Sequence, residues 1–291
     1  MNALSNLNTH GFYSDPRENH LLAVLPAADL ERWRPYLEMV AMPSGSPLCH
    51  AGESPTHVYF PTTASVSIQQ ITHAGASVEI AAIGHEGMVG VPVIMGGGST
   101  PSHAVVRATG YGFRMGSQCV RSEFRRSEAV MRLLLLYGQA LMTQTSQTAL
   151  CNLHHTLDQR LCRCLLMSMD RLHGPSLSMT HEGMAGLLGV RREGVTSAAL
   201  KLQRAGVIEY ARGRVKVLDR GALEAQSCEC YEVVTDEYRR LLPQACEPCV
   251  PAPGRPAPVA EQSAWQRAPQ SGLEPFHTRS RVPQTDVAAA W

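Results

Sequence analysis

Residues 177–208 read LSMTHEGMAGLLGVRREGVTSAALKLQRAGVI and carry the clearest structural pattern of this 291-residue sequence. Thr180 is a favourable N-cap for a first short helix, and Gly189 can adopt the left-handed conformation that ends it. A second helix is expected over about 192–205 and stops at Gly206. Two short helices joined by a tight glycine-containing turn predict a helix-turn-helix.

A β-hairpin is predicted directly after the second helix. Residues 207–210 and 215–218 are strand-like, and the tip Arg212-Gly213-Arg214 separates them. A short hairpin with a basic tip, following a helix-turn-helix, predicts the wing of a winged helix.

The N-terminal half has a different pattern, with short strand-like segments and many glycines from about residue 21 to residue 121. Residues 66–71 and 78–82 flank a turn at Gly75 and predict a β-hairpin. Further strands are expected at 57–60, 105–107 and 113–115. Many short strands with glycine-rich turns predict a small barrel or sandwich.

From about residue 122 the apolar period becomes helical, and a long helix is expected with a break near 152–156. Its broad apolar stripe and few charges favour a partner helix, and a parallel two-stranded coiled coil would make the protein a homodimer. Alternatively, the helix packs only on its own β domain. The expected dimer seam consists of Met131, Leu134, Gly138, Leu141, Met142 and Thr145.

The formal net charge of +1 conceals an asymmetry along the chain. Residues 21–120 hold four Arg and six acidic residues, a net charge of −2. Residues 161–220 hold eight Arg, two Lys and five acidic residues, a net charge of +5. This asymmetry indicates an anionic partner for the second half, with a solvated cationic face as the alternative.

Composition also indicates the cellular compartment. No window reaches about 18 uninterrupted apolar residues, so no membrane span is expected. The N-terminal segment lacks a basic stretch followed by an apolar one, so no secretory signal is expected. The nine cysteines lack the spacing of a disulfide framework, which fits a reducing cytoplasm.

Two close cysteine pairs lie near the C-terminus, Cys228 with Cys230 and Cys246 with Cys249. Four thiolates in two pairs could bind zinc, but this spacing is irregular, so free thiols and no metal site are expected. His154 and His155, at the expected break of the long helix, are expected to cap or pack rather than to act as ligands.

The order of these segments resembles the Crp/Fnr family of bacterial transcription regulators over about residues 21–225. The similar stretches are VYFP at 58–61, the turn region 84–90, VRA at 106–108, the long helix running into Arg160-Leu161, and GVRRE at 189–193 followed by Val195. The resemblance implies an α+β fold with an N-terminal β-roll of the cyclic-nucleotide-binding, jelly-roll type, a long dimerisation helix and a C-terminal winged helix-turn-helix. It implies palindromic double-stranded DNA, a second copy of the chain, RNA polymerase and an unidentified small-molecule effector as partners.

The resemblance and the composition together suggest a domain organisation. The expected parts are a flexible arm (1–20), a β-roll effector domain (21–121), a dimerisation helix (122–156), a winged helix-turn-helix (157–225) and a C-terminal extension (226–291). From about residue 243 the extension has nine prolines and few apolar residues, which predicts disorder.

The effector pocket departs from the cyclic-AMP-binding members of the family. Val91 follows Gly90 where those members place a Glu, and Ser102 or His103 stands where they place the phosphate-binding Arg. A buried cyclic phosphate without its Arg loses a charge-assisted hydrogen bond, so no response to cyclic AMP is expected. The expected pocket positions are Gly87, Gly90, Val91, Ser102 and His103. Because the first cysteine is Cys49, the N-terminal iron–sulfur set of the oxygen-sensing members is absent.

The second helix of the helix-turn-helix offers the candidate base readers. An Arg can pair bidentately with guanine, and a carboxylate can accept a hydrogen bond from cytosine N4. The candidate base-reading residues are Arg192, Glu193, Thr196 and Ser197. Side chains that suit phosphate contacts, which position the protein without reading sequence, are Thr180, Arg191, Lys201, Arg212 and Arg214.

Motifs of catalysis are missing from the sequence. We find no nucleophile elbow, no phosphate-binding Walker loop and no His-Glu-x-x-His helix. No enzymatic activity and no cofactor are therefore expected. The alternative to a DNA-binding regulator is a ligand- or redox-sensing β-roll protein whose DNA binding is vestigial or that regulates only through partners.

Overall fold

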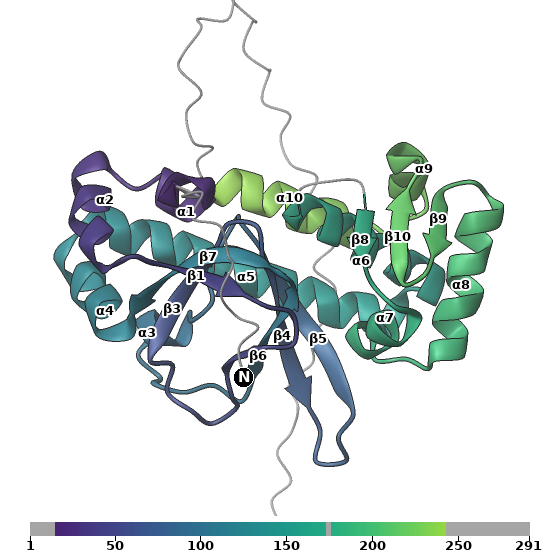
Figure 1. Ribbon diagram of the computed structural model, residues 1–291, viewed down its shortest axis with the longest axis horizontal. Coiled ribbons are helices and arrows are strands. Elements are labelled where there is room, and N and C mark those ends of the chain that lie inside the picture. Colours follow the sequence, from purple (N-terminus) through teal and green to yellow (C-terminus); the bar gives the residue numbers. More distant parts are fainter. Residues whose placement is uncertain (1–14, 173–175, 243–291) are drawn as a thin grey trace, which may run out of the picture. The chain divides into compact units, whose positions relative to one another are not determined.

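The computed structural model describes residues 15–172 and 176–242, all within one structural unit of residues 1–247 (Figure 1). The first fourteen residues of the expected arm, the expected disordered tail, Cys246 and Cys249 lie outside the described residues. Within the described ranges, no helix has both the length and the apolar character that a membrane crossing requires.

The N-terminal segment is helical, whereas the sequence predicted a loose arm followed by strands. Asn19 is fully buried and caps the first α-helix, and its side-chain amide donates hydrogen bonds of 2.8 Å to the carbonyls of Pro61 and Gly87. Residues 15–20 therefore belong to the fold and not to a flexible arm. The elements are η1 (Pro16–Glu18), α1 (His20–Ala23), α2 (Ala27–Trp33) and η2 (Arg34–Tyr36).

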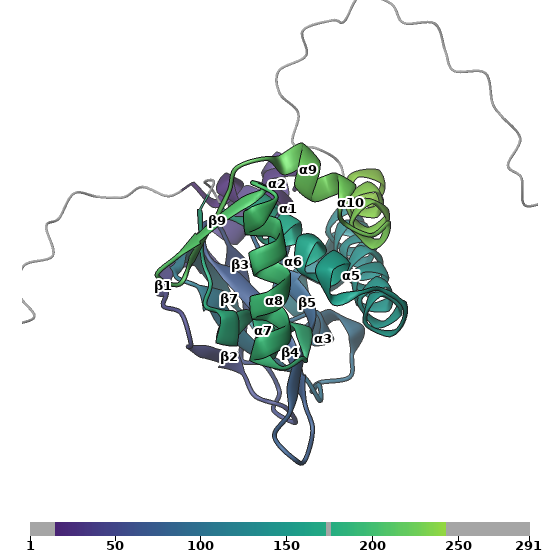
Figure 2. The ribbon, with the colours of Figure 1, turned by 90° about the vertical axis from the view of Figure 1, so that its right-hand side faces the viewer.

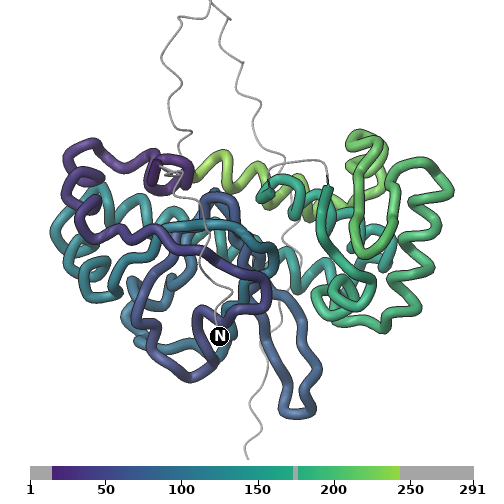
Figure 3. The backbone as a smooth tube through the Cα atoms, in the orientation of Figure 1, coloured from purple at the N-terminus to yellow at the C-terminus, as the bar shows by residue number. Residues whose placement is uncertain are grey.

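Seven antiparallel strands then form the expected β-roll as two sheets (Figure 1), and Figure 3 traces the path of the chain through this region. One sheet has the order β1-β7-β3, and the other has the order β2-β6-β4-β5. The strands are β1 (Glu38–Met42), β2 (Pro47–Cys49), β3 (His57–Pro61), β4 (Ser65–Ile71), β5 (Ser77–Ile83), β6 (His103–Ala108) and β7 (Gly110–Gly116). The β4–β5 hairpin is confirmed, with Gly75 at φ +84° in its turn. The edge strands β1 and β2 were not predicted.

The helices that follow the β-roll are α3 (Pro92–Met95), α4 (Ser117–Arg126) and α5 (Glu128–His154). Ser127 separates α4 from α5 and caps α5 through its side chain. The predicted break near 152–156 is confirmed, because α5 ends at His154 and the next helix starts at Leu157 with a Thr156–Gln159 capping box.

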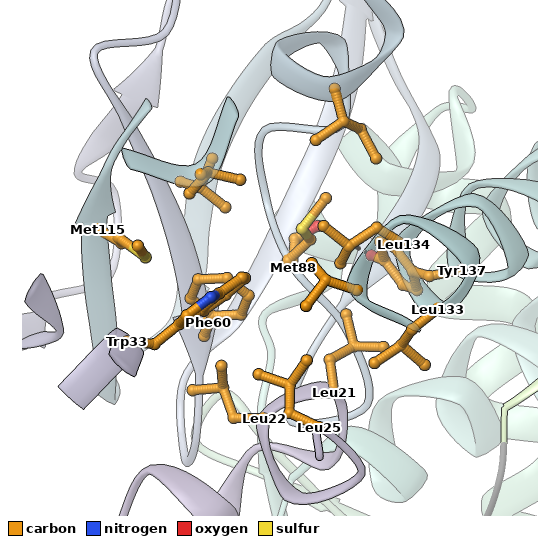
Figure 4. Packing of buried hydrophobic residues seen from close by; sticks show 14 of the residues in the cluster. Leu21, Leu22, Leu25, Trp33, Phe60, Met88, Met115, Leu133, Leu134 and Tyr137 are labelled. Atoms are coloured by element: carbon orange, nitrogen blue, oxygen red, sulfur yellow. Dashed lines mark hydrogen bonds between the residues drawn. The ribbon is translucent and has the colours of Figure 1, made fainter. Parts of the chain in front are cut away.

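Helix α5 is part of the β-roll core (Figure 4). Leu134 is 1% exposed and packs in the same cluster as Trp33 and Phe60, whose rings lie 5.9 Å apart. The Tyr137 hydroxyl donates a 2.9 Å hydrogen bond to the Met88 carbonyl. The prediction that Leu134 belongs to a dimer seam is therefore wrong, because its side chain already fills the core of its own chain.

The C-terminal region is a winged helix, as predicted, followed by two further helices. Its elements are α6 (Leu157–Arg171), β8 (Ser176–Ser178), α7 (His181–Leu188), α8 (Arg192–Arg204), β9 (Ile208–Ala211), β10 (Arg214–Val217), α9 (Arg220–Ala225) and α10 (Cys230–Leu241). Figures 1 and 2 show α10 alongside α5, where Tyr238 packs against the Tyr137 ring. Residues 224–242, for which the sequence indicated doubtful order with a short helix-like piece, are thus a packed part of the fold.

Candidate functional site

Local capping and turn signals build the helix-turn-helix. The Thr180 hydroxyl accepts a 3.0 Å hydrogen bond from the Gly183 amide and so caps α7. Gly189 ends α7 in the left-handed conformation at φ +63°. Val195, Ala199 and Leu202 lie in the core of the winged helix, which leaves the opposite face of α8 exposed.

The exposed face of α8 and the wing are rich in free positive charge. Arg192, Glu193 and Ser197 are all exposed, as the sequence predicted for base-reading residues. Between residues 176 and 217, six exposed cationic side chains make no ion pair with the described part of the chain: Arg191, Arg192, Arg204, Arg212, Arg214 and Lys216. Free cations clustered on a helix-turn-helix and its wing favour binding to phosphates.

The wing tip is a two-residue turn between β9 and β10. Ala211 pairs with Arg214, and the turn residues Arg212 and Gly213 have φ angles of +49° and +75°. Positive φ at both positions is typical of the type I′ turns that close β-hairpins. For the non-glycine Arg212 this conformation costs about 1–2 kcal/mol, so the fold accepts strain to hold an arginine at the tip.

Two predicted DNA contacts are engaged within the protein. The Thr196 hydroxyl lies 3.0 Å from Nδ1 of His181 and donates to the Arg192 carbonyl, so it joins α7 to α8. Burial, together with the nearby charge of Arg192, lowers the pKa of His181. Lys201 forms a 2.7 Å ion pair with Asp158. Thr196 is therefore better placed to position α8 than to read bases.

A cavity of about 370 Å³ opens in the β-roll. Of the predicted pocket residues, Gly90, Val91, Ser102 and His103 line this cavity, but Gly87 does not. Gly87 instead faces Tyr137, whose hydroxyl oxygen would lie 2.5 Å from any added Cβ atom. Its role is to allow close packing on α5, and its assignment to the pocket is wrong.

Helix α5 supplies a wall of this cavity that the sequence did not predict. The α5 residues that line it are Gly138, Leu141, Met142, Thr145 and Ser146. They alternate with residues that point into the core, so the periodic pattern alone could not separate pocket from seam. A ligand in the cavity would therefore touch the helix on which dimerisation is expected to depend.

The cavity is largely apolar. No Arg, Lys, Asp or Glu occurs among its described lining residues, and the side chains there that can carry charge are Cys49, His57, Tyr59 and His103. Burial, followed by the charge of Glu53, raises the pKa of Cys49, which favours the neutral thiol. The Ser102 hydroxyl accepts a 2.9 Å hydrogen bond from Gln70, so part of its bonding capacity is already used.

The outer face of α5 carries unpartnered apolar side chains. Leu135 is 52% exposed and Met142 is 62% exposed, whereas Leu141 is half-buried and packs on the β-roll. The outward residues recur with alternating spacings of four and three, as in a coiled-coil seam: Met131, Leu135, Gly138, Met142, Thr145 and Ala149. Of the six predicted seam positions, Leu134 and Leu141 pack on the β-roll, and the other four remain predictions on the outward side, which also carries Leu135 and Ala149.

Of the four C-terminal cysteines, Cys228 and Cys230 lie within the described residues. Cys228 and Cys230 are buried free thiols next to Cys151 and His155 from the end of α5. His155 is also the C-cap residue of α5, in agreement with the predicted capping role, because its amide donates to the Cys151 carbonyl.

Comparison with known proteins supports this description. Residues 159–226 match the family model of the Crp-like helix-turn-helix domain. FixK2 from Bradyrhizobium japonicum is similar in structure with a TM-score of 0.57 and 15% identity, covering 66% of this chain and 98% of that one. A CRP/FNR-family transcriptional regulator from Thermus thermophilus has a TM-score of 0.54 and 16% identity, with 65% and 98% covered. No sequence among the curated proteins matches.

A third structure, CLP from Xanthomonas campestris, is described as a c-di-GMP-responsive global regulator. It has a TM-score of 0.54 and 16% identity, and the match covers 67% of this chain and all of that one. The chain therefore shares with these proteins a fold made of a β-roll, a long helix and a winged helix. Its match to the Crp-like helix-turn-helix domain is confined to residues 159–226.

Proposed function

We propose that this protein is a cytoplasmic, homodimeric regulator that binds an inverted-repeat operator and controls transcription without enzymatic activity. The observation that carries the proposal is the set of unpaired cations on α8 and the wing, centred on Arg192. In this arrangement α8 enters the major groove, where Arg192, Glu193 and Ser197 read base edges. Thr180, Arg191, Arg212 and Arg214 contact phosphates, while Thr196 holds α8 against α7. Lys201 joins the phosphate contacts once it leaves Asp158.

The dimer forms through the outer face of α5. Leu135 and Met142 are large, exposed and one heptad apart, and Gly138 between them allows close approach of a second helix. Two copies of α5 packed in parallel would present two α8 helices related by a two-fold axis. Such a dimer requires an operator with two half-sites about one helical turn apart.

The β-roll cavity binds an uncharged or largely apolar effector and not cyclic AMP. A cyclic phosphate in this cavity would find neither an Arg nor a Lys among the described lining residues. Because Met142 and Thr145 belong both to the cavity wall and to the α5 seam, an effector acts on the dimer directly. RNA polymerase is the expected partner of the DNA-bound dimer.

Selection from random-sequence DNA tests the proposal. Purified full-length protein is incubated with a random duplex library, and the retained sequences are determined over several rounds. We expect an inverted repeat with half-site centres about 10–10.5 base pairs apart. Recovery of no sequence preference, or of a single unrepeated site, would overturn the homodimeric operator-binding function.

A further inference from the structure

Four potential metal ligands meet at the junction between the long helix and the C-terminal extension. Cys151 lies in the last turn of α5, and His155 is the C-cap residue of that helix. Cys228 lies in the turn between α9 and α10, and Cys230 is the first residue of α10. The thiol sulfurs and a ring nitrogen of His155 all lie within 4.8 Å of one another.

The four residues form a compact and protected group. The sulfur atoms of Cys151 and Cys228 are 3.5 Å apart, and the Cys230 sulfur is 3.5 Å from Nδ1 of His155. All three cysteines are buried, and the imidazole is 13% exposed. The cluster is thus largely shielded from bulk solvent.

We propose that Cys151, His155, Cys228 and Cys230 bind one Zn²⁺ ion in tetrahedral coordination. Zinc–sulfur bonds of about 2.3 Å and zinc–nitrogen bonds of about 2.0–2.1 Å place neighbouring ligand atoms roughly 3.5–3.8 Å apart. The two measured separations already equal the lower value, and the widest pair must close by about 1 Å. An iron–sulfur cluster places iron and sulfide between its thiolates and needs a wider ligand set.

Glu229, the residue before Cys230, orients the imidazole ligand. It places a carboxylate oxygen 3.3 Å from Nε2 of His155. With Nδ1 bound to the ion, Nε2 carries the proton and donates to this carboxylate. A carboxylate–histidine–metal arrangement fixes the tautomer of the ligand and increases its basicity.

The charge around the cluster suits three thiolates. Zn²⁺ with three thiolates and a neutral imidazole has a net charge of −1. Arg163 is 9% exposed, donates to Thr148 and has no carboxylate partner among the described residues, while its Nε lacks an acceptor. The Arg163 charge acts on both Cys151 and Cys230, so the anionic site would compensate a buried cation that otherwise has no counter-ion.

Zinc binds cysteine as the thiolate. The ion therefore displaces the thiol protons as it binds, and the zinc affinity should fall as the pH falls.

Zinc in this position ties together segments that are far apart in the sequence. His155 precedes α6 by one residue, Thr156, and α6 begins the winged-helix region. The ion would hold the start of α10 against the end of α5, at the break between the long helix and the DNA-binding region. This role as a structural clamp is independent of the operator-binding function, because it depends on none of the DNA contacts.

Metal analysis of the full-length protein tests the site. Protein purified under reducing conditions with Zn²⁺ supplied is expected to hold about one zinc per chain. Co²⁺ exchanged for zinc should give tetrahedral d–d bands and thiolate charge-transfer bands with the intensity of three thiolates. The Co²⁺ spectrum of the wild-type chain reports the ligand set without relying on any variant.

Matched variants separate this site from other ligands. Cys228→Ser and His155→Ala should each lower zinc affinity at least tenfold, while His154→Ala, at the exposed neighbouring histidine, and Cys119→Ser should retain it. The Cys246→Ser/Cys249→Ser double variant should also retain zinc. Circular dichroism on each variant confirms that the helices are present.

Four results would overturn the proposal. These are a wild-type chain that takes up no zinc, one that holds iron with acid-labile sulfide, a Cys151–Cys228 disulfide that excludes the metal, and loss of zinc in the Cys246/Cys249 double variant.

Discussion

The β-roll and the winged helix use their arginines in opposite ways. Each of the four Arg in residues 21–120 forms an ion pair with a carboxylate of its own chain. The pairs are Arg32–Asp29, Arg34–Glu31, Arg107–Glu79 and Arg114–Glu38. Of the seven Lys and Arg in residues 176–217, Lys201 alone has an acidic partner within the described part of the chain.

This difference shows why net charge is a weaker guide to function than charge pairing. A guanidinium that is already paired has little to gain from a phosphate, whereas an unpaired, exposed one exchanges counterions for the DNA backbone. The four arginines of the β-roll are thus already paired, and its cavity has neither Arg nor Lys among the described lining residues. The unpaired cations of the winged helix remain available to an anion.

Separation of the two subunits should have the largest effect on operator affinity. The Leu135→Lys/Met142→Lys double variant places charge on the exposed seam of α5 without touching the core. We expect folded monomers by sedimentation. We also expect the operator affinity to fall by several orders of magnitude, because a monomer can contact only one of the two half-sites. A dimeric double variant with unchanged binding would show that α5 is not the seam.

Removal of unpaired cations should weaken binding to all DNA. The Arg191→Ala/Arg212→Ala/Arg214→Ala variant loses six phosphate contacts per dimer. At about 0.9 per contact, the slope of log K against log salt should decrease in magnitude by about five. Fluorescence anisotropy with random-sequence DNA at several salt concentrations measures the slope.

The paired arginine Arg114 provides the control for that experiment. Arg114→Ala removes a cation that is bound to Glu38 on the β-roll surface, so the salt slope should not change. If the slope of log K against log salt is equal for the triple variant, Arg114→Ala and the wild type, the proposal that unpaired cations contact DNA and paired ones do not would be contradicted.

Two adjacent leucines on α5 distinguish the core from the seam. Leu134→Ala should lower the free energy of unfolding by about 2–5 kcal/mol, because it leaves a cavity in the core of the β-roll. Leu135→Ala leaves that core intact, so the free energy of unfolding of the monomer should change by less than about 0.5 kcal/mol, while the dimer should dissociate more readily. Urea denaturation at a protein concentration that keeps both variants monomeric gives the comparison, and a larger loss of monomer stability for Leu135→Ala would contradict the assignment of the two faces of the helix.

The winged helix could be predicted almost residue by residue because its signals are local. Thr180 starts α7, Gly189 ends it, and Gly206 follows α8, as the sequence indicated. The packing partners of helix α5 were harder to predict, since the helix is apolar on both its inward and outward faces. A period of 3.6 residues identifies the helix but cannot say whether Leu134 meets the same chain or another copy.

Long-range pairings were the least predictable features. Sequence proximity grouped Cys228 and Cys230 with the tail cysteines, whereas folding brings them to Cys151 on α5. The N-terminal helices were also missed, because Asn19 orders that segment through carbonyls that lie far along the chain. Contacts between residues that are far apart in the chain produce no periodic pattern in a single sequence.

Cyclic AMP should have the smallest effect, namely none. The cavity offers neither Arg nor Lys among its described lining residues, so a buried cyclic phosphate would lack the charge-assisted hydrogen bonds of an Arg. We expect no heat of binding in calorimetry at millimolar cyclic AMP and no change in operator affinity. Micromolar binding would show that backbone groups of the glycine-rich turns neutralise the phosphate.

The account depends most on Arg192 as a base reader. The measurement is the affinity of the wild type and of Arg192→Ala for the selected operator and for a scrambled duplex, at two salt concentrations. We predict that Arg192→Ala loses about 1–3 kcal/mol per half-site on the operator, relaxes the preference at one G·C pair and binds scrambled DNA nearly as well as the wild type. An equal loss on both duplexes would make Arg192 a phosphate contact and contradict the proposed mode of reading.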